Sequence, residues 1–208
     1  EEAKILLIFS FQQHWANEMR PSAGGAWNYC DELAKWFSGA RSALGPTAIG
    51  LFTDIDETHR VILAPLAQMN ETGMCESLER AARRGATVVL TADFARLDEC
   101  NNVLRRPSLQ PLAEWGLPMP DLELLHLKSG CAIEGSIGQT AVIGRHFCAV
   151  SRIDEPVEGI GKIAVEGRTV PAALRYSLGK GQVVVSLTAL DGDSVAIFLR
   201  NLITDSHQ

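Results

Sequence analysis

The sequence predicts an α/β fold: a three-layer sandwich built on a mainly parallel sheet, with antiparallel β ribbons in the C-terminal half. Short, continuous apolar runs such as ILLIF at 5–9 and TVVLT at 87–91 are typical of strands covered on both faces. Amphipathic stretches of helical length separate these runs, and strands that alternate with helices favour a parallel sheet. After Pro107 the pattern changes to short β-rich runs with glycine-bearing turns, which indicates antiparallel ribbons; we expect those at 131–178 to attach at one edge of the sheet.

Each element has its own pattern in the sequence. The segments expected to form central strands are 4–9, 47–51, 61–64, 86–91 and 182–188. The first long helix ends at Gly45-Pro46, and the second ends at Gly85. In the first helix, apolar residues recur at spacings of three and four: Trp27, Cys30, Leu33, Ala34, Phe37 and Ala40. A closing helix follows the last strand, with Asp193 or Ser194 expected as its N-cap.

The chain reads as one domain over 1–208, since 208 residues with 46% hydrophobic content can bury a single sizeable core. Its expected parts are an α/β core at 1–106, an irregular segment with β ribbons at 107–178, and a closing strand and helix at 179–208. The chain opens with EEAKILLIFS, without an initiator Met, and a strand begins almost at once. We therefore expect it to be a segment of a longer chain.

Charge and cysteine content argue against several classes of function. A formal net charge of -6 with scattered basic residues disfavours nucleic acid as a partner, because that affinity needs clustered Lys and Arg. We also expect no membrane partner and a cytoplasmic location, since no apolar run approaches bilayer length. The five cysteines are too widely spaced for a disulfide framework or a metal knuckle. No metal or other cofactor is expected.

The string LFTDIDETH resembles a catalytic loop, because Asp54, Asp56 and Thr58 match the D-x-D-x-T pattern of haloacid-dehalogenase-type phosphatases. In such a loop one carboxylate attacks phosphorus and the next acts as acid and base, with Mg²⁺ offsetting the charge. Here only residues 54–60 separate two apolar runs, which is too short for the helix or cap that follows that loop. A solvated acidic turn is the simpler interpretation.

The turn Ala92-Asp93-Phe94 follows the strand at 86–91, where many α/β enzymes carry a nucleophile. A nucleophile elbow needs Ser or Cys between small residues, whereas Asp93 is followed by Phe94. An aspartate nucleophile would need a positioned base. The five histidines lie in unrelated contexts and nominate none: His14, His59, His126, His146 and His207.

The segment from Ser10 to Trp27 leaves the first strand where open α/β sheets bind ligands. Gln12-Gln13-His14 and the Pro and Gly residues at 21–25 favour a loop, yet the segment also carries Phe11, Trp15, Met19 and Trp27. Trp and Arg are common interface anchors, so these residues suit a sugar platform or a protein contact. The alternative is that the tryptophans cap the sheet edge. The interface or ligand-facing candidates are Ser10, Trp15, Arg20 and Trp27.

Several stretches, taken in order, resemble the middle or trimerisation domain of family 42 glycoside hydrolases, which are bacterial β-galactosidases. They are ILLIFSFQQHWANEMRPS, WNYCDELAKWF, VILAP, LERAARRGATVVLTADFARLDE and VPAALRYSLGKGQVVVSLTAL. The resemblance covers nearly the whole chain. It implies a flavodoxin-like sheet similar to that of class I glutamine amidotransferases. In those enzymes the turn after the corresponding strand carries the catalytic Cys, so Asp93 marks a vestigial nucleophile position and the glutaminase triad is absent.

The resemblance also implies a role in assembly. The family's trimerisation domain carries no catalytic residues and surrounds a separate (β/α)₈ barrel, which needs about 250 residues of its own. The implied partners are the barrel domain of the parent chain and neighbouring subunits of a homo-oligomer such as a trimer. The favoured hypothesis is therefore a non-catalytic accessory domain. The alternative is a small hydrolase or Mg-dependent phosphatase acting through Asp54/Asp56 or Asp93, which would require Asp54, Asp56 and Asp191 to converge.

Overall fold

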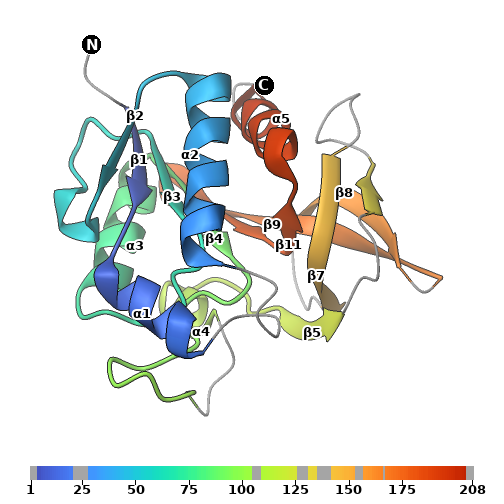
Figure 1. The fold of residues 1–208 in the computed structure, drawn as a ribbon, viewed down its shortest axis with the longest axis horizontal. Helices are drawn as coiled ribbons and strands as arrows, with labels where there is room; N and C mark the ends of the chain where they lie inside the picture. The colour runs from blue at the N-terminus through green and yellow to red at the C-terminus, as the bar shows by residue number, and fades with distance from the viewer. Residues whose placement is uncertain are drawn as a thin grey trace.

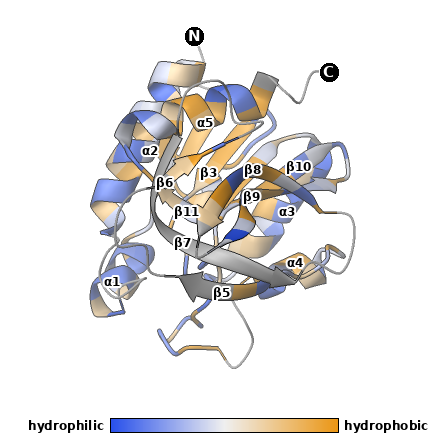
Figure 2. Cartoon of the chain, turned by 90° about the vertical axis from the view of Figure 1, so that its right-hand side faces the viewer, coloured by the Kyte–Doolittle hydropathy of each residue, from blue (hydrophilic) through white to orange (hydrophobic). Residues whose placement is uncertain are grey.

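The computed structural model has the predicted α/β architecture, with helices on both faces of a central sheet (Figure 1). It describes residues 4–20, 28–104, 109–125, 131–134, 142–152, 157–165 and 167–204. Two long helices lie on one side of the sheet and a third lies on the other (Figure 2). Among the described residues no helix is both long and apolar enough to cross a bilayer.

The central sheet has seven strands. In spatial order they are β2 (Thr47–Gly50), β1 (Ile5–Ile8), β3 (Val61–Ala64), β4 (Thr87–Thr91), β10 (Gly181–Ser186), β9 (Arg168–Leu178) and β8 (Glu158–Val165). The first five are parallel, and β9 and β8 extend the sheet antiparallel to β10. The parallel strands run in the flavodoxin-like order, in which the direction of winding reverses between β1 and β3. The carboxyl ends of β1 and β3 therefore form the edge where such folds place their sites.

The helices cover the sheet as an apolar sandwich requires. On one face α2 (Tyr29–Leu44) packs against α5 (Gly192–Thr204), and the rings of Trp36 and Phe198 meet edge to face with centroids 6.2 Å apart. On the opposite face α3 (Met74–Arg84) packs against β4 and β10 (Figure 2). The strands between these layers are hydrophobic, and Ile62, Leu90 and Val184 are fully buried.

A second sheet holds the remaining strands. They are β11 (Thr188–Leu190), β7 (Val142–Arg152), β5 (Asp121–Leu125) and β6 (Cys131–Ile133), all paired antiparallel. The short helix α4 (Gln110–Glu114) precedes them. The prediction of antiparallel strands is confirmed, but the prediction that they all attach at one edge is wrong. Only β8 and β9 extend the central sheet, while a bridge between Glu134 and Lys162 links the two sheets.

Three local predictions need correction. The strand expected at 182–188 ends at Ser186, because Thr188 and Leu190 pair with β7 and so belong to the second sheet. The closing helix begins at Gly192, so Asp193 and Ser194 lie in its first turn and neither precedes it as N-cap.

The apolar face of α2 is also rotated relative to the expected one. The structure buries Tyr29, Leu33, Trp36 and Ala40 and leaves Cys30 exposed. The large indole of Trp36 fills the space against α5, so the stripe that contains it is buried in preference to the stripe through Cys30 and Phe37.

Candidate functional site

The segment after β1 forms a helix, α1 (Phe11–Met19), which corrects the expectation of a loop. Ser10 is the N-cap: its Oγ accepts from the N–H groups of Gln12 and Gln13 at 3.1 and 3.5 Å. A serine cap satisfies amides that the first helical turn leaves unpaired, and 11–19 contains no Pro or Gly to break the helix. The residues that favoured a loop, at 21–25, lie outside the described part of the chain.

The inner face of α1 is polar, and hydrogen bonds fix it to the loop that follows β3. The side-chain amide of Gln13 donates to Met69 O (2.7 Å) and to Glu71 Oε1 (2.9 Å), and its oxygen accepts from Met69 N–H (2.9 Å). Asn17 donates to Leu66 O at 3.1 Å. Both amides are at least 95% buried, so α1 has one firmly defined orientation.

The outer face of α1 is apolar. Phe11, Trp15 and Met19, spaced four residues apart, are 63%, 58% and 66% exposed. The rings of Phe11 and Trp15 lie 6.1 Å apart, so they form one continuous surface. We call these three residues the α1 stripe. A surface helix normally buries its large apolar residues, whereas α1 buries Gln13, Ala16 and Asn17 and exposes its three largest apolar side chains.

The predicted interface candidates have different positions. Trp15 belongs to the α1 stripe, and Arg20 is an exposed residue at the C-cap of α1. Ser10 was expected to face a partner or ligand, but it is only 4% exposed. Its hydroxyl caps the helix, and its N–H donates to the Tyr29 hydroxyl (3.2 Å). Trp27 lies outside the described residues.

The turn after β4 is held rigidly. Thr91 Oγ1 donates to Asp93 Oδ1 at 2.7 Å and accepts from Leu66 N–H at 2.9 Å. Asp93 is only 8% exposed, and the neighbouring ring of Phe94 is fully buried against Trp115. These contacts give the Asp93 carboxylate a structural role in joining the turns after β3 and β4.

The carboxylates of Asp54 and Asp56, in the acidic string after β2, accept hydrogen bonds from neighbouring residues of the same loop. Asp54, in the short helix η2 (Phe52–Asp54), accepts from Leu51 N–H at 2.8 Å. Asp56 accepts from the N–H and hydroxyl of Thr58 at 2.8 and 2.6 Å, and these bonds, with a smaller effect of His59, lower the pKa of its exposed carboxyl. No three Asp, Glu, His or Cys side chains among the described residues are placed to hold a metal ion. The phosphatase alternative requires Asp54, Asp56 and Asp191 to converge on a metal site, and the described residues form no such site.

One thiol and one imidazole come together at the flank of α1. Cys30 Sγ lies 3.7 Å from His14 Nδ1. Cys30 lies on α2, not in the turn after β4, and no sequence pattern pairs it with His14. The anchoring role of Gln13 and Asn17 was also not predicted. Their i, i+4 spacing, offset from the α1 stripe, is a pattern that could have indicated an anchored helix.

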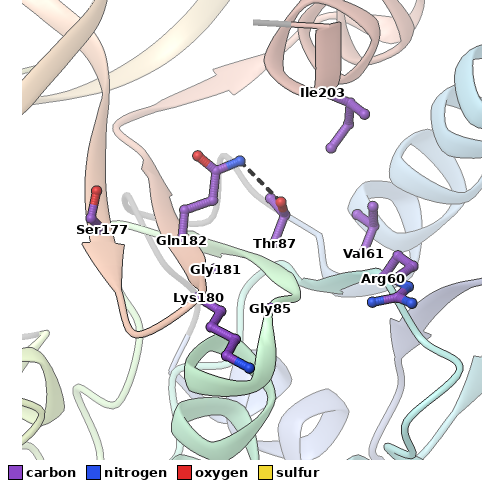
Figure 3. A pocket seen from close by; sticks show the side chains of 9 residues that line it. All are labelled: Arg60, Val61, Gly85, Thr87, Ser177, Lys180, Gly181, Gln182 and Ile203. Atoms are coloured by element: carbon purple, nitrogen blue, oxygen red, sulfur yellow. Dashed lines mark hydrogen bonds between the residues drawn. The ribbon is translucent and has the colours of Figure 1, made fainter. Parts of the chain in front are cut away.

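A cavity of about 540 Å³ opens at the amino ends of β3, β4 and β10, the edge opposite α1 (Figure 3). Gln182 Nε2 donates to Thr87 Oγ1 there at 3.0 Å. Lys180 extends across the C-terminal end of α3, where a cation offsets the helix dipole. Among the described residues that line the cavity there is no carboxylate, histidine or cysteine, so they do not supply an acid–base pair.

Glu32, buried on α2, leads to a pH-dependent prediction. Burial raises the pKa of its carboxyl above the ordinary 4.5, although Lys35, its hydrogen-bonded partner, opposes the shift. The folded state therefore holds this proton more tightly, so the contribution of Glu32 to stability is fully present below pH 4.5 and is lost as the pH rises through the folded-state pKa. We expect Glu32→Gln to raise the free energy of unfolding at pH 7 and to have no such effect at pH 4, in urea titrations at both values.

The control for Glu32→Gln is Glu57→Gln, which neutralises an exposed carboxylate and should change stability little at either pH. A Glu32→Gln variant less stable than the unmodified chain at pH 7 would show that the ion pair with Lys35 outweighs the burial of the charge.

Comparison with known proteins assigns the domain. The β-galactosidase trimerisation domain family matches residues 3–208. Among solved structures, the β-galactosidase from Bacillus circulans sp. alkalophilus is similar, with a TM-score of 0.82 and 18% identity over 99% of this chain and 31% of that one. A catalytic mutant of a family 42 β-galactosidase from G. stearothermophilus has a TM-score of 0.81 and 16% identity over 100% of this chain and 30% of that one.

The β-galactosidase from Rahnella sp. R3 is similar to the same degree, with a TM-score of 0.81 and 16% identity over 99% of this chain and 31% of that one. The chain thus spans about a third of each of these proteins, whose likeness establishes the fold. Comparison with curated proteins yields no match. The matched family is the trimerisation domain and not the catalytic domain, so this chain is a non-catalytic accessory domain. It belongs to the β-galactosidase trimerisation domain family.

Proposed function

We propose that this domain joins the subunits of a parent glycoside hydrolase, and that the α1 stripe is its contact surface. The observation that supports the proposal is the reversed polarity of α1: Phe11, Trp15 and Met19 are exposed while Gln13 and Asn17 are buried. A stable monomer gains nothing from three large apolar side chains in water, whereas an interface that covers them gains about 25 cal/mol for each Å² removed from solvent.

The anchoring of α1 favours a contact surface over a loosely packed helix. Because Gln13 and Asn17 make hydrogen bonds to the β3 loop in the free chain, α1 cannot turn its apolar face inward without leaving buried polar groups unpaired. The stripe is thus preorganised, and a preorganised surface loses less conformational entropy when it binds. Trp15 lies between Phe11 and Met19 in the sequence, so it is the expected anchor of the contact.

The parent protein is proposed to be a β-galactosidase-like enzyme. The support is that the similar solved structures are β-galactosidases about three times as long as this chain. In the parent, a separate (β/α)₈ barrel would hold the catalytic residues, and this domain would contact that barrel and the neighbouring subunits. The small-hydrolase alternative has less support, since Asp54, Asp56 and Asp93 are each engaged in local hydrogen bonds.

Truncating the central residue of the stripe tests the proposal. We expect Trp15→Ala to weaken self-association of the chain by about 30-fold or more, because removing a buried aromatic anchor costs about 2 kcal/mol or more. Light scattering across a concentration series measures the change. Circular dichroism should show an unchanged fold, since the Trp15 side chain is 58% exposed in the chain alone.

The matched control is Val103→Ala, which truncates an exposed apolar residue on the loop before α4. It should associate like the unmodified chain. Equal association of the Trp15 variant and the unmodified chain would show that the stripe is not the contact surface.

A further inference from the structure

A second apolar surface lies at the end of the central sheet. Ile49 and Leu51 are 57% and 47% exposed, and we call these two residues the β2 edge. Strand β2 pairs with β1 on one side and ends the seven-stranded sheet on the other. An exposed apolar edge strand invites pairing with other chains, and proteins usually cover or charge such an edge.

The α1 stripe and the β2 edge are neighbouring but separate surfaces. Phe9 joins them: its N–H donates to Gly50 O at 2.8 Å, and its ring packs edge to face on Phe11 with centroids 5.0 Å apart. Figure 1 shows β2 running along the side of the sheet and α1 lying beyond the end of β1. One surface therefore follows the side of the domain and the other lies across its end.

Threefold symmetry requires two different surfaces. A contact between identical surfaces closes a dimer, whereas a closed ring of three copies needs a heterologous contact, in which one patch of each copy meets a different patch of the next. This domain belongs to a trimerisation family and exposes two apolar patches that flank one corner. We infer that the α1 stripe of one copy packs on the β2 edge of the next. The inference rests on the function proposed above.

The charges around the two patches support the same pairing. The loop that follows the β2 edge is acidic, with exposed carboxylates at Asp54, Asp56 and Glu57. The C-terminal end of α1 carries Arg20, and Arg96 donates to its carbonyl at 3.4 Å. Arg20 also lies within electrostatic reach of Asp98 of its own chain, and Glu18 is the one carboxylate on α1.

Self-contacts would be less favourable electrostatically. An α1-to-α1 contact would bring two copies of the Arg20 end of α1 together. A β2-to-β2 contact would bring together the exposed carboxylates of two loops. The α1-to-β2 contact sets Arg20 and Arg96 beside the acidic loop of the next copy, an arrangement that favours association and fixes its register. It also gives the acidic string of residues 54–57 a role that no catalytic interpretation supplies.

Site-directed cross-linking between two singly substituted chains tests the inference. Gln12→Cys places a thiol beside the α1 stripe, and Thr53→Cys places one beside the β2 edge. Both positions are exposed, and both patches stay intact. The background is Cys30→Ser with Cys100→Ser, which removes two exposed thiols. A short bismaleimide should link the two chains when they are mixed and should link neither variant to itself.

A chain that carries both substitutions should yield a covalent trimer on a denaturing gel. The control is Gln12→Cys mixed with Thr169→Cys, whose exposed thiol lies on β9, near the opposite end of the sheet from β2, and should give only background linkage. The doubly serine-substituted chain without added thiols measures linkage through the remaining cysteines.

The possible outcomes separate the inference from the function on which it rests. Self-linkage of Gln12→Cys would indicate an α1-to-α1 contact and overturn the inference while the proposed role of the stripe stands. Absence of linkage between Gln12→Cys and Thr53→Cys, in a chain whose association still depends on Trp15, would also overturn it. If the chain does not self-associate, or if its association does not depend on Trp15, both the proposed function of the α1 stripe and this inference are overturned.

Discussion

Replacing Gln13 by alanine is expected to lower the free energy of unfolding by about 2–4 kcal/mol, because buried partners are left unpaired. The Gln13 amide makes hydrogen bonds with both backbone groups of Met69 and with Glu71, at 2.7 to 2.9 Å, and it is 1% exposed. Its loss leaves a donor, a carbonyl and a carboxylate without these bonds. Because these contacts also orient α1, association should weaken together with stability. Urea unfolding and light scattering measure the two effects.

The matched control for Gln13→Ala is the adjacent residue. Gln12→Ala removes the same side chain from the exposed side of α1 and leaves the backbone N–H that Ser10 caps. It should change stability by no more than about 0.5 kcal/mol. Similar losses in the two variants would show that helix propensity, and not the buried amide contacts, holds α1 in place.

Gly181→Ala is expected to cost about 3 kcal/mol or more, because the added methyl group has no room. A Cβ at this position would lie 2.3 Å from Ala86 O and 2.5 Å from Ala82 O. Both contacts are to backbone, so the start of β10 would have to move away from the C-terminal end of α3. That movement would disturb the parallel pairing of β10 with β4, which begins at Gln182 and Thr87. Thermal or urea unfolding detects the loss.

The control for the glycine variant is Gly192→Ala, at the first residue of α5, where a Cβ meets nothing within 4 Å. This variant should be as stable as the unmodified chain or slightly more so, since alanine favours a helix over glycine. A Gly181→Ala chain of normal stability would mean that β10 and α3 do not approach each other this closely in solution.

The central sheet could be predicted from sequence because its strands are short, continuous apolar runs. VILA at 61–64 and TVVLT at 87–91 are fully buried on both faces, so their hydrophobicity directly reports their position. The division of the antiparallel strands between two sheets could not be predicted. It depends on where the chain leaves β10, and residues 187–190, which cross to the second sheet, are as buried as β10 itself.

Helix α1 was missed for a physical reason. Sequence patterns assume that large apolar residues point inward, but in α1 the large residues that point inward are Gln13 and Asn17, whose partners lie more than 40 positions away in the chain. The composition of the segment predicted a contact surface, which stays a prediction; Trp15 is 58% exposed. The β2 edge gave no comparable sign, since Ile49 and Leu51 look like ordinary strand residues until the sheet order places β2 at the end.

Sedimentation equilibrium of the unmodified chain, from micromolar to millimolar concentration, most directly tests the claim that this domain assembles through α1. We expect an apparent mass that rises from 22.6 kDa toward three times that value, and we expect the mass of Trp15→Ala to rise only at much higher concentration. A mass that stays at 22.6 kDa throughout, or one that rises identically in the Trp15 variant, would contradict it.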